Sequence, residues 1–226
     1  MIRGILFDLD GTLIDSERET AEAMARALER RAGIAIEQYD RDFIIGRSWI
    51  AIYDSLKARY PQLAWTRAET IANVADVRGE VLAELGLTVL PGVRDALAWT
   101  SPLRRALVTG SSRLEVEQVL PHLLPFLGRH FDTIVAAEDV ARSKPAPDGY
   151  LMAIAALGLS PRDCLVVEDS EAGITAGRDA GCVVLAVRAG NFGGWRQDHA
   201  HLVVDTLVEL TPSLVDRLGR DYGSSR

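Results

Sequence analysis

The feature that most constrains the fold is a series of short, continuously apolar segments with helical patterns between them. Five of these segments occupy residues 4–8, 106–109, 133–136, 164–168 and 183–187, and residues 202–204 form a candidate sixth. Continuous apolar runs are typical of parallel strands that helices cover on both faces. The helical patterns lie at residues 113–120, 148–157 and 171–180. The sequence therefore predicts an α/β fold, a doubly wound, Rossmann-like parallel sheet.

One long segment interrupts this alternation. Residues 16–87 contain no predicted strand, and helical patterns rich in Ala, Glu, Arg and Leu cover residues 17–31, 48–60 and 66–85. Pro91 and Gly92 mark the return to the sheet. We therefore predict a main domain of residues 1–15 and 88–226, with a helical insertion of residues 16–87 after the first strand.

Charge and cysteine content limit the classes of partner and location. The formal net charge is −7, whereas a nucleic-acid or anionic-membrane surface needs clustered Lys and Arg, so we expect neither partner. Apolar runs fall far short of the roughly 20 residues of a membrane helix, and no signal-peptide pattern is present. Cys164 and Cys182 adjoin apolar strands, so we expect two buried, reduced thiols in a cytoplasmic protein.

Two aspartates follow the first predicted strand, in the motif Asp8-Leu9-Asp10-Gly11-Thr12. Residues two apart in an extended chain point to the same side, so Asp8 and Asp10 would lie together. Two close carboxylates repel each other unless a cation or a proton intervenes. Mg²⁺ prefers oxygen ligands together with a substrate phosphate. The motif therefore predicts a Mg²⁺ site, and Gly11 would let the chain turn away sharply.

Residues suited to binding an anion follow the second and third strands. Thr109, Gly110 and Ser111 precede a predicted helix, and backbone N–H groups at a helix N-terminus can hold a phosphoryl oxygen. Taken alone, such residues are usually helix caps. Lys144 lies in a loop with two prolines, and its ammonium could offset the charge of a phosphoryl group and of Asp8.

Two adjacent acids, Glu168 and Asp169, end the fourth apolar run. Acids at the end of a buried strand are costly as purely structural residues, since desolvating charge is unfavourable. One of them would bind the metal ion and the other would support it. Ligands of open parallel sheets bind beyond the carboxyl ends of the strands, where all four groups of residues are expected.

These four groups, in this order and spacing, resemble the haloacid dehalogenase superfamily. The nearest likeness is to its phosphatases and β-phosphoglucomutase-like enzymes, which have a helical cap after the first strand. The resemblance covers nearly the whole chain, and it is most specific in the segments 8–12 and 168–169. It implies a phosphoric monoester hydrolase that hydrolyses a small phosphorylated metabolite (a sugar, polyol or short-acid phosphate) through an aspartyl-phosphate.

The same resemblance implies roles for individual residues. Asp8 is the expected nucleophile, and Asp10 first protonates the leaving alcohol and then deprotonates water. Thr109 and Lys144 are expected to bind the phosphoryl group. Asp8, Asp169 and the backbone carbonyl of Asp10 are the expected Mg²⁺ ligands, with Glu168 beside them.

The helical insertion, residues 16–87, is the expected cap, which would exclude water and select the substrate. Within it, Gly46-Arg47-Ser48 is similar to the family's cap loop that reaches toward the active site. Arg47 would contact the distal end of the substrate, although an exposed surface arginine is an equally good interpretation. The sequence does not name the substrate, and it is compatible with a monomer or a small homo-oligomer.

Two alternatives to a phosphatase remain at this point. A β-phosphoglucomutase-like enzyme would transfer the phosphoryl group within a sugar, but that branch usually has a histidine about where this chain has Thr20. A protein that binds a phosphorylated metabolite without turning it over is disfavoured, because every expected functional group is present. A dehalogenase would not need Asp10, Glu168 and Asp169.

Overall fold

The computed structural model describes residues 1–47, 49–127 and 130–223, and it divides into two compact units. The sheet unit comprises Met1–Asp15, Thr88–Asn191 and Trp195–Arg226. The helical unit comprises Ser16–Leu87 together with Phe192–Gly194. Each unit has its own architecture, which follows from its own sequence pattern.

The sheet unit contains a six-stranded sheet in the order β5-β4-β1-β6-β7-β8, and every neighbouring pair is parallel. The strands are β1 (Gly4–Phe7), β4 (Arg104–Val108), β5 (Thr133–Val135), β6 (Cys164–Glu168), β7 (Val183–Val187) and β8 (Leu202–Val204). Strands β1, β6 and β7 are buried along their whole length, as continuous apolar runs require. The predicted α/β fold is confirmed, including the sixth strand.

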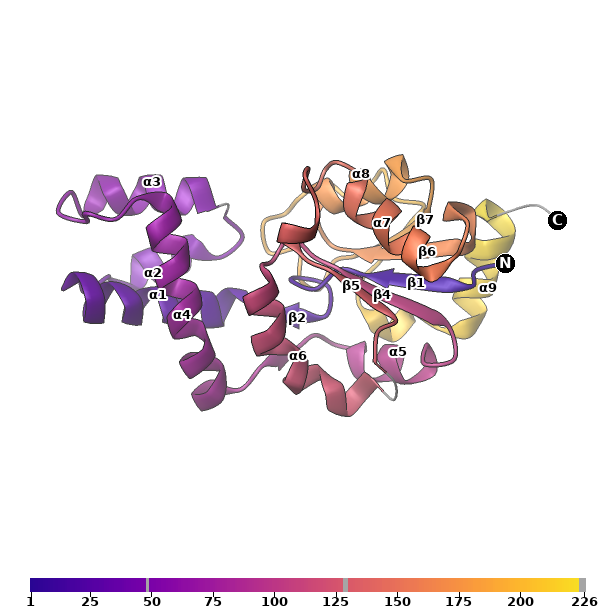
Figure 1. Ribbon diagram of the computed structural model, residues 1–226, viewed down its shortest axis with the longest axis horizontal. Helices are drawn as coiled ribbons and strands as arrows, with labels where there is room; N and C mark the ends of the chain where they lie inside the picture. Colours follow the sequence, from indigo (N-terminus) through magenta and orange to yellow (C-terminus); the bar gives the residue numbers. More distant parts are fainter. Residues whose placement is uncertain (48, 128–129, 224–226) are drawn as a thin grey trace. The chain divides into compact units, whose positions relative to one another are not determined.

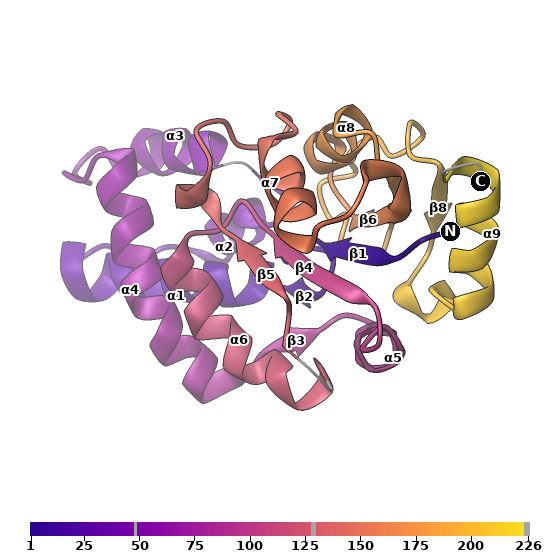
Figure 2. The same ribbon diagram turned by 45° about the vertical axis from the view of Figure 1, so that its right-hand side comes forward.

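Helices cover both faces of this sheet (Figures 1 and 2). They are α5 (Val93–Trp99), α6 (Arg113–Leu127), α7 (Asp148–Leu157), α8 (Glu171–Asp179) and α9 (Pro212–Tyr222), with short 3₁₀ turns at η2 (Ala137–Asp139), η3 (Pro161–Asp163) and η4 (Leu207–Glu209). Helix α7 packs on β4 and β5, and α8 packs on β6 and β7. Both views show these two helices on the face opposite to α5. The core beneath α7 and α8 contains Leu6, Val166 and Ile174.

Two elements of the sheet unit differ from the sequence-based expectation. Strand β4 begins at Arg104, two residues early, because Arg105 is fully buried and its guanidinium donates to the Leu97 carbonyl at 2.7 Å. Helix α6 ends at Leu127 rather than near residue 120, and it continues through Pro121 and Pro125. Val116, Val119 and Leu123 give it one continuous buried face that outweighs the cost of the prolines.

The helical unit is built from α1 (Glu17–Ala27), α2 (Gln38–Ile44), α3 (Trp49–Arg59) and α4 (Arg67–Leu85), and the π-helical turn η1 (Leu28–Ala32) extends α1. Helices α1 and α4 make the main packing contact. Their buried faces form a separate core with Met24, Leu28 and Val77. A capping box of Thr66 and Glu69 begins α4. Helix α2, which the sequence pattern did not predict, completes this unit.

A short antiparallel ribbon marks the two ends of the helical segment. Strand β2 (Ile14–Asp15) pairs with β3 (Thr88–Val89), so that Asp15 lies opposite Thr88. Both strands belong to the sheet unit. In the described part of the chain, none of the helices has both the length and the apolar character needed to cross a membrane.

Candidate active site

The candidate site lies at the carboxyl ends of three adjacent strands. Asp8 directly follows β1, Thr109 directly follows β4, and Glu168 is the last residue of β6. Because β1 lies between β4 and β6 in the sheet, these residues lie side by side at the carboxyl ends of the strands (the carboxyl edge). Lys144 reaches the same place from the loop before α7. The topology thus brings together residues that are far apart in the sequence, such as Asp8 and Glu168.

A tight turn holds the first of these segments. Gly11 has φ of +81°, which a residue with a side chain rarely adopts, and an added Cβ would lie 2.3 Å from Oδ2 of Asp169. The backbone N–H of Gly11 donates to the Ile14 carbonyl at 2.8 Å. The Thr12 hydroxyl donates to Oδ1 of Asp169 at 3.3 Å. The turn therefore fits closely against Asp169, and only glycine leaves room for that carboxylate.

Lys144 is the cation of the site. Its ammonium donates to Oδ1 of Asp8 at 2.5 Å and to Oε1 of Glu168 at 2.6 Å. A third bond, at 3.0 Å, goes to the Val108 carbonyl. Burial lowers the pKa of a lysine, but the charges of Asp8 and Glu168 outweigh burial and hold the pKa of Lys144 well above its ordinary value. Lys144 therefore stays charged in this site.

Glu168 is completely buried and surrounded by donors. Oε1 accepts from Lys144 and from the Tyr150 hydroxyl at 3.1 Å. Oε2 accepts from the backbone N–H groups of Asp169 and Ser170 at 2.9 Å, and from the Ser170 hydroxyl at 3.0 Å. Gly173 leaves the space, since a Cβ there would lie 1.6 Å from Oε1. Glu168 is thus fixed in orientation and in turn fixes Lys144.

Asp8, Glu168 and Asp169 form a cluster of three buried acids, each with a carboxylate oxygen within 4.8 Å of the others. Three carboxylates and one ammonium leave two negative charges uncompensated when all are ionised. Burial and the neighbouring acids raise the pKa of Asp8 to about 7 and that of Asp169 well above its ordinary value, although Lys144 opposes both shifts. A divalent cation would supply the missing positive charge, so the donor set fits a metal ion that prefers oxygen ligands.

Asp10 lies next to this cluster and has a different partner. Its Oδ2 accepts from the Ser111 hydroxyl at 2.5 Å. The backbone N–H of Ser111 donates to the hydroxyl of Thr109 at 2.9 Å. A Cβ added to Gly110 would meet nothing within 4 Å, so the backbone there faces open space. The structure therefore brings Asp10, Thr109 and Ser111 together beside Asp8, while Ser112 and Glu115 cap helix α6.

Arg47 was predicted to contact the substrate. It lies in the helical unit, where its guanidinium sits 5.1 Å from the ring centroid of Phe43. Its role in substrate contact stays a prediction. Ser48, the last residue of the predicted cap loop, is outside the described residues.

Two polar residues of the site were missed by the sequence analysis. Tyr150, completely buried on α7, supports Glu168. The side-chain amide of Gln197 donates to the carbonyls of Asp169 and Val187 at 2.6 and 2.8 Å, and so ties the Asp169 segment to the loop after β7. Tyr150 is a polar residue in a strongly apolar helix, which is a usable signal. Gln197 lies in a loop without any pattern that could have found it.

Comparisons with known proteins agree with this geometry. Hexitol phosphatase A of Escherichia coli K12 is 36% identical over 92% of this chain and 93% of its own length. Fructose-1-phosphate phosphatase YqaB of the same organism is 34% identical over 82% of this chain and 96% of its own. The crystal structure of CbbY from Rhodobacter sphaeroides in complex with phosphate superposes with a TM-score of 0.75 at 25% identity, covering 96% of this chain and all of the other. Residues 2–181 match the haloacid dehalogenase-like hydrolase family, to which this chain belongs.

Proposed function

We propose that this protein is a Mg²⁺-dependent phosphatase that hydrolyses a small sugar or polyol phosphate through an aspartyl-phosphate on Asp8. The observation that carries the proposal is the buried cluster of Asp8, Lys144, Glu168 and Asp169 at the carboxyl edge of the sheet. The two relatives described above, a hexitol phosphatase and a fructose-1-phosphate phosphatase, support this class of substrate.

In the first step, a carboxylate oxygen of Asp8 attacks phosphorus, the bond from phosphorus to the ester oxygen breaks, and Asp10 gives its proton to the leaving alcohol. In the second step, Asp10 takes a proton from water, the water oxygen attacks phosphorus, and the bond to Asp8 breaks to release phosphate. Covalent catalysis divides one difficult displacement into two easier ones. The Ser111 hydroxyl, bonded to Asp10, would hold that carboxylate in position for both transfers.

The phosphoryl group would lie against Lys144, Thr109 and the open backbone at Gly110. Lys144 contributes a fixed positive charge, since its own position is set by Glu168 and the Val108 carbonyl. Such preorganised charge stabilises the negative oxygens of the transferring group without reorganisation during the reaction. The same ammonium opposes the raised pKa of Asp8 and favours its nucleophilic, ionised form.

Mg²⁺ would be held by Asp8, Asp169 and the backbone carbonyl of Asp10. Both oxygens of Glu168 already have donors, so we assign this acid to supporting Lys144 and the Asp169 segment beside the ion. When bound, the cation supplies positive charge to the phosphoryl oxygens and to the carboxylate cluster. The ion would also lower the pKa of Asp8 further.

We assign residues 16–87 to a cap that excludes water from the reaction and selects the substrate. The support for a separate unit is its own apolar core, which includes Met24, Leu28 and Val77. Arg47, which carries no ion pair within the described residues, would contact the distal part of the substrate. Replacing Arg47 with alanine should shift the ranking of substrates, and unchanged kinetics across a panel would remove this role.

The decisive experiment measures phosphate release from a panel of hexitol, sugar and short-acid phosphates, with Mg²⁺ or with EDTA. Asp8→Asn should abolish release, because its amide is not a nucleophile. Asp10→Asn should leave slow turnover, since general acid–base catalysis is typically worth about 10² to 10⁴ in rate. An active Asp8→Asn protein would exclude the covalent mechanism. If β-glucose 1-phosphate is isomerised and no ester is hydrolysed, the protein is a mutase instead.

A further inference from the structure

A second cleft lies at the amino ends of β6, β7 and β8 (the amino edge), opposite to the end of the strands that carries the Asp8 site. It has a volume of about 500 Å³. Arg162 lies two residues before β6, His201 directly precedes β8, and Arg178 is in the last turn of α8. Arg220 and Tyr222, near the end of α9, complete the wall. Because all these strands are parallel, this cleft and the Asp8 site are at opposite ends of the strands.

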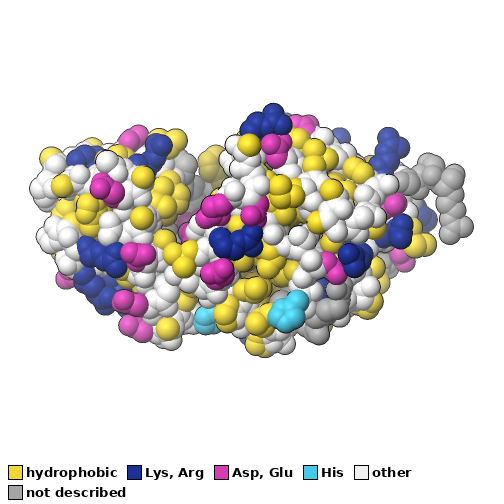
Figure 3. Space-filling view, viewed as in Figure 1, with side chains coloured by type: hydrophobic (Ala, Val, Ile, Leu, Met, Phe, Trp, Pro, Cys, Tyr) yellow, Lys and Arg dark blue, Asp and Glu magenta, His cyan; other side chains and the backbone are white. Residues whose placement is uncertain are grey.

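The cleft concentrates positive charge in an acidic protein. Arg162, Arg178 and Arg220 line it, against one acid, Asp221, and none of the three forms an ion pair with any described residue. Arginines elsewhere on the surface are commonly paired, as Arg142 is with Asp148 at 2.7 Å. Figure 3 shows several Lys and Arg side chains, with Asp and Glu side chains among them, at the right-hand end of the sheet unit. The cleft is therefore a local basic site in a chain of net charge −7.

The side chains of His201 and Arg178 together present one N–H group for which the described residues supply no acceptor. Its Nδ1 accepts from the backbone N–H of Val184 at 2.9 Å, and its Nε2 lies 2.5 Å from a guanidinium nitrogen of Arg178. A neutral imidazole has one donor and one acceptor nitrogen. With Nδ1 as the acceptor, Nε2 carries the proton and faces the N–H of Arg178. In the other tautomer, Nδ1–H would face the N–H of Val184, so one contact always joins two donors.

Protonation of His201 would not relieve this conflict, because both ring nitrogens would then be donors. Burial and the charge of Arg178 lower the pKa of His201 to about 4, so the ring is neutral near pH 7. The ring of Tyr222 lies against His201 with a centroid distance of 4.6 Å and limits its rotation. What the pair of Arg178 and His201 needs is an acceptor oxygen on the cleft side, bonded to both donors.

We propose that this cleft binds a small molecule carrying a phosphate group, one of whose oxygens accepts from Arg178 and from Nε2–H of His201. Arg162 and Arg220 would supply further charge-assisted hydrogen bonds to the other oxygens. The guanidinium fork matches phosphate geometry, and an anion with several oxygens can satisfy several donors at once. The site is separate from the Asp8 site and does not rest on the catalytic proposal.

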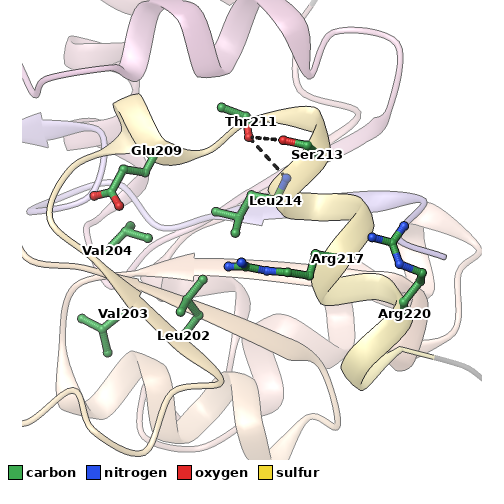
Figure 4. A pocket seen from close by; sticks show the side chains of 9 residues that line it. All are labelled: Leu202, Val203, Val204, Glu209, Thr211, Ser213, Leu214, Arg217 and Arg220. Atoms are coloured by element: carbon green, nitrogen blue, oxygen red, sulfur yellow. Dashed lines mark hydrogen bonds between the residues drawn. The ribbon is translucent and has the colours of Figure 1, made fainter.

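A neighbouring hollow supplies the matched control. A groove of about 550 Å³ lies between β8 and α9, and Arg217 lines it (Figure 4). Figure 4 shows Arg217 extending across the groove toward β8, and Arg220, which lines both hollows, further along the same helix. Arg217 has the same charge as Arg220, is on the same helix and does not line the proposed site. Arg217→Gln therefore removes one positive charge nearby without touching the cleft.

The test follows the ring proton signals of His201 by NMR across a pH titration in EDTA, with and without inorganic pyrophosphate. Loss of the signals in His201→Gln assigns them among the four histidines of the chain. Pyrophosphate should raise the pKa of His201 by about 1 to 3, because an adjacent anion favours the charged ring. Sodium chloride at the same ionic strength should not reproduce this rise.

Calorimetric titration of pyrophosphate into the variants completes the design. Arg178→Gln should weaken binding at this site about tenfold, so that a fixed, sub-saturating pyrophosphate concentration gives a smaller pKa rise, while Arg217→Gln should change neither. An unchanged His201 pKa in the wild-type protein, or an affinity and a pKa rise in Arg178→Gln equal to those of the wild type, would overturn the proposal. Binding at the Asp8 site cannot imitate the result, since the reporter ring is at the other end of the strands. Phosphate release is not measured, so the catalytic proposal stands or fails separately.

Discussion

The two ends of the parallel strands, the carboxyl edge and the amino edge, carry opposite charge and differ in how deeply that charge is buried. At the carboxyl edge, Asp8, Glu168 and Asp169 are almost entirely buried around Lys144. At the amino edge, the cleft arginines are exposed, and His201 is only partly buried. An unpaired charge is costly when it is buried, so the stability of the carboxyl edge depends on each acid having a partner. The arginines of the amino edge are hydrated, so they can stay unpaired at little cost in stability. Residues at the carboxyl edge should therefore be far more sensitive to substitution.

The largest effect is expected for Lys144→Met. This variant leaves Asp8 and Glu168 without their shared cation, and it removes the positive charge beside the phosphoryl group. Loss of one preorganised donor typically costs about 10² to 10³ in kcat, so we expect a decrease of at least that order. Steady-state phosphate release with saturating Mg²⁺ measures it.

The matched control for this variant is Arg142→Met, two residues earlier in the same loop. Arg142 is 72% exposed and pairs with Asp148, and an exposed pair of this kind contributes about 0 to 1 kcal/mol to stability. Its kcat should stay close to that of the wild type. Equal losses in the two variants would show that the loop, and not the buried ammonium, is what matters.

A smaller effect is expected for Gly173→Ala. The new methyl group would overlap Glu168, whose Oε1 lies 1.6 Å from the position of the Cβ, so Glu168 has to move away from Lys144. Overpacking of this kind costs about 1 to 3 kcal/mol of unfolding free energy. Chemical denaturation measures the stability, and phosphate release should show a lower kcat.

Gly177→Ala separates crowding of the helix from displacement of Glu168. Gly177 is one turn further along α8 and is also buried, but an added Cβ would contact Val166 and Val184 at 3.1 Å. This variant should lose some stability and keep its kcat. The comparison fails if both glycine variants reduce kcat to the same extent.

A different kind of contrast between the two edges is how stability depends on pH in the metal-free protein. The folded-state pKa of Asp8, about 7, is above its ordinary value of 3.8, so between these values the folded state binds more protons. Stability from this group is therefore lost as pH rises from about 4 to 7. The pKa of His201 is lowered from 6.5 to about 4, so its contribution has the opposite sign, and stability rises with pH in that window.

Denaturation curves in EDTA at several pH values test this difference in sign. The difference in unfolding free energy between the wild type and Asp8→Asn should fall as pH rises. The same difference for His201→Gln should rise with pH. Added Mg²⁺ should reduce the fall for Asp8→Asn, because the cation stabilises ionised Asp8. Slopes of the same sign for the two residues would contradict the contrast between the edges.

The sheet was predictable because its strands are simple apolar runs, and the position of the site followed from parallel topology. Two of its acids, Asp8 and Asp169, lie at the ends of predicted strands, and Lys144 lies in the loop that follows another. Their positions in the sequence therefore indicated that they would meet. The catalytic roles, and the contact of Arg47 with substrate, stay predictions.

The sequence could not reveal buried polar side chains whose hydrogen-bond partners are distant in the sequence. Arg105 is a charged residue inside a buried strand, where its guanidinium donates a hydrogen bond to the Leu97 carbonyl. Tyr150 depends in the same way on Glu168, and Gln197 on two carbonyls. His201 shows the same limit in another form, since its two contacts, from β7 and from α8, leave one N–H group facing another donor. Local pattern cannot anticipate a partner contributed by another element.

The ribbon of β2 and β3 has a consequence for how this protein can diversify. Asp15 and Thr88 are paired neighbours, so residues 16–87 leave the sheet unit and return to it at two adjacent positions. A helical segment of another length or sequence could be joined at the same two positions without shifting the register of the six parallel strands. Recombination at these junctions would exchange what lies between them as a module, while the chemistry at the sheet edge was inherited unchanged.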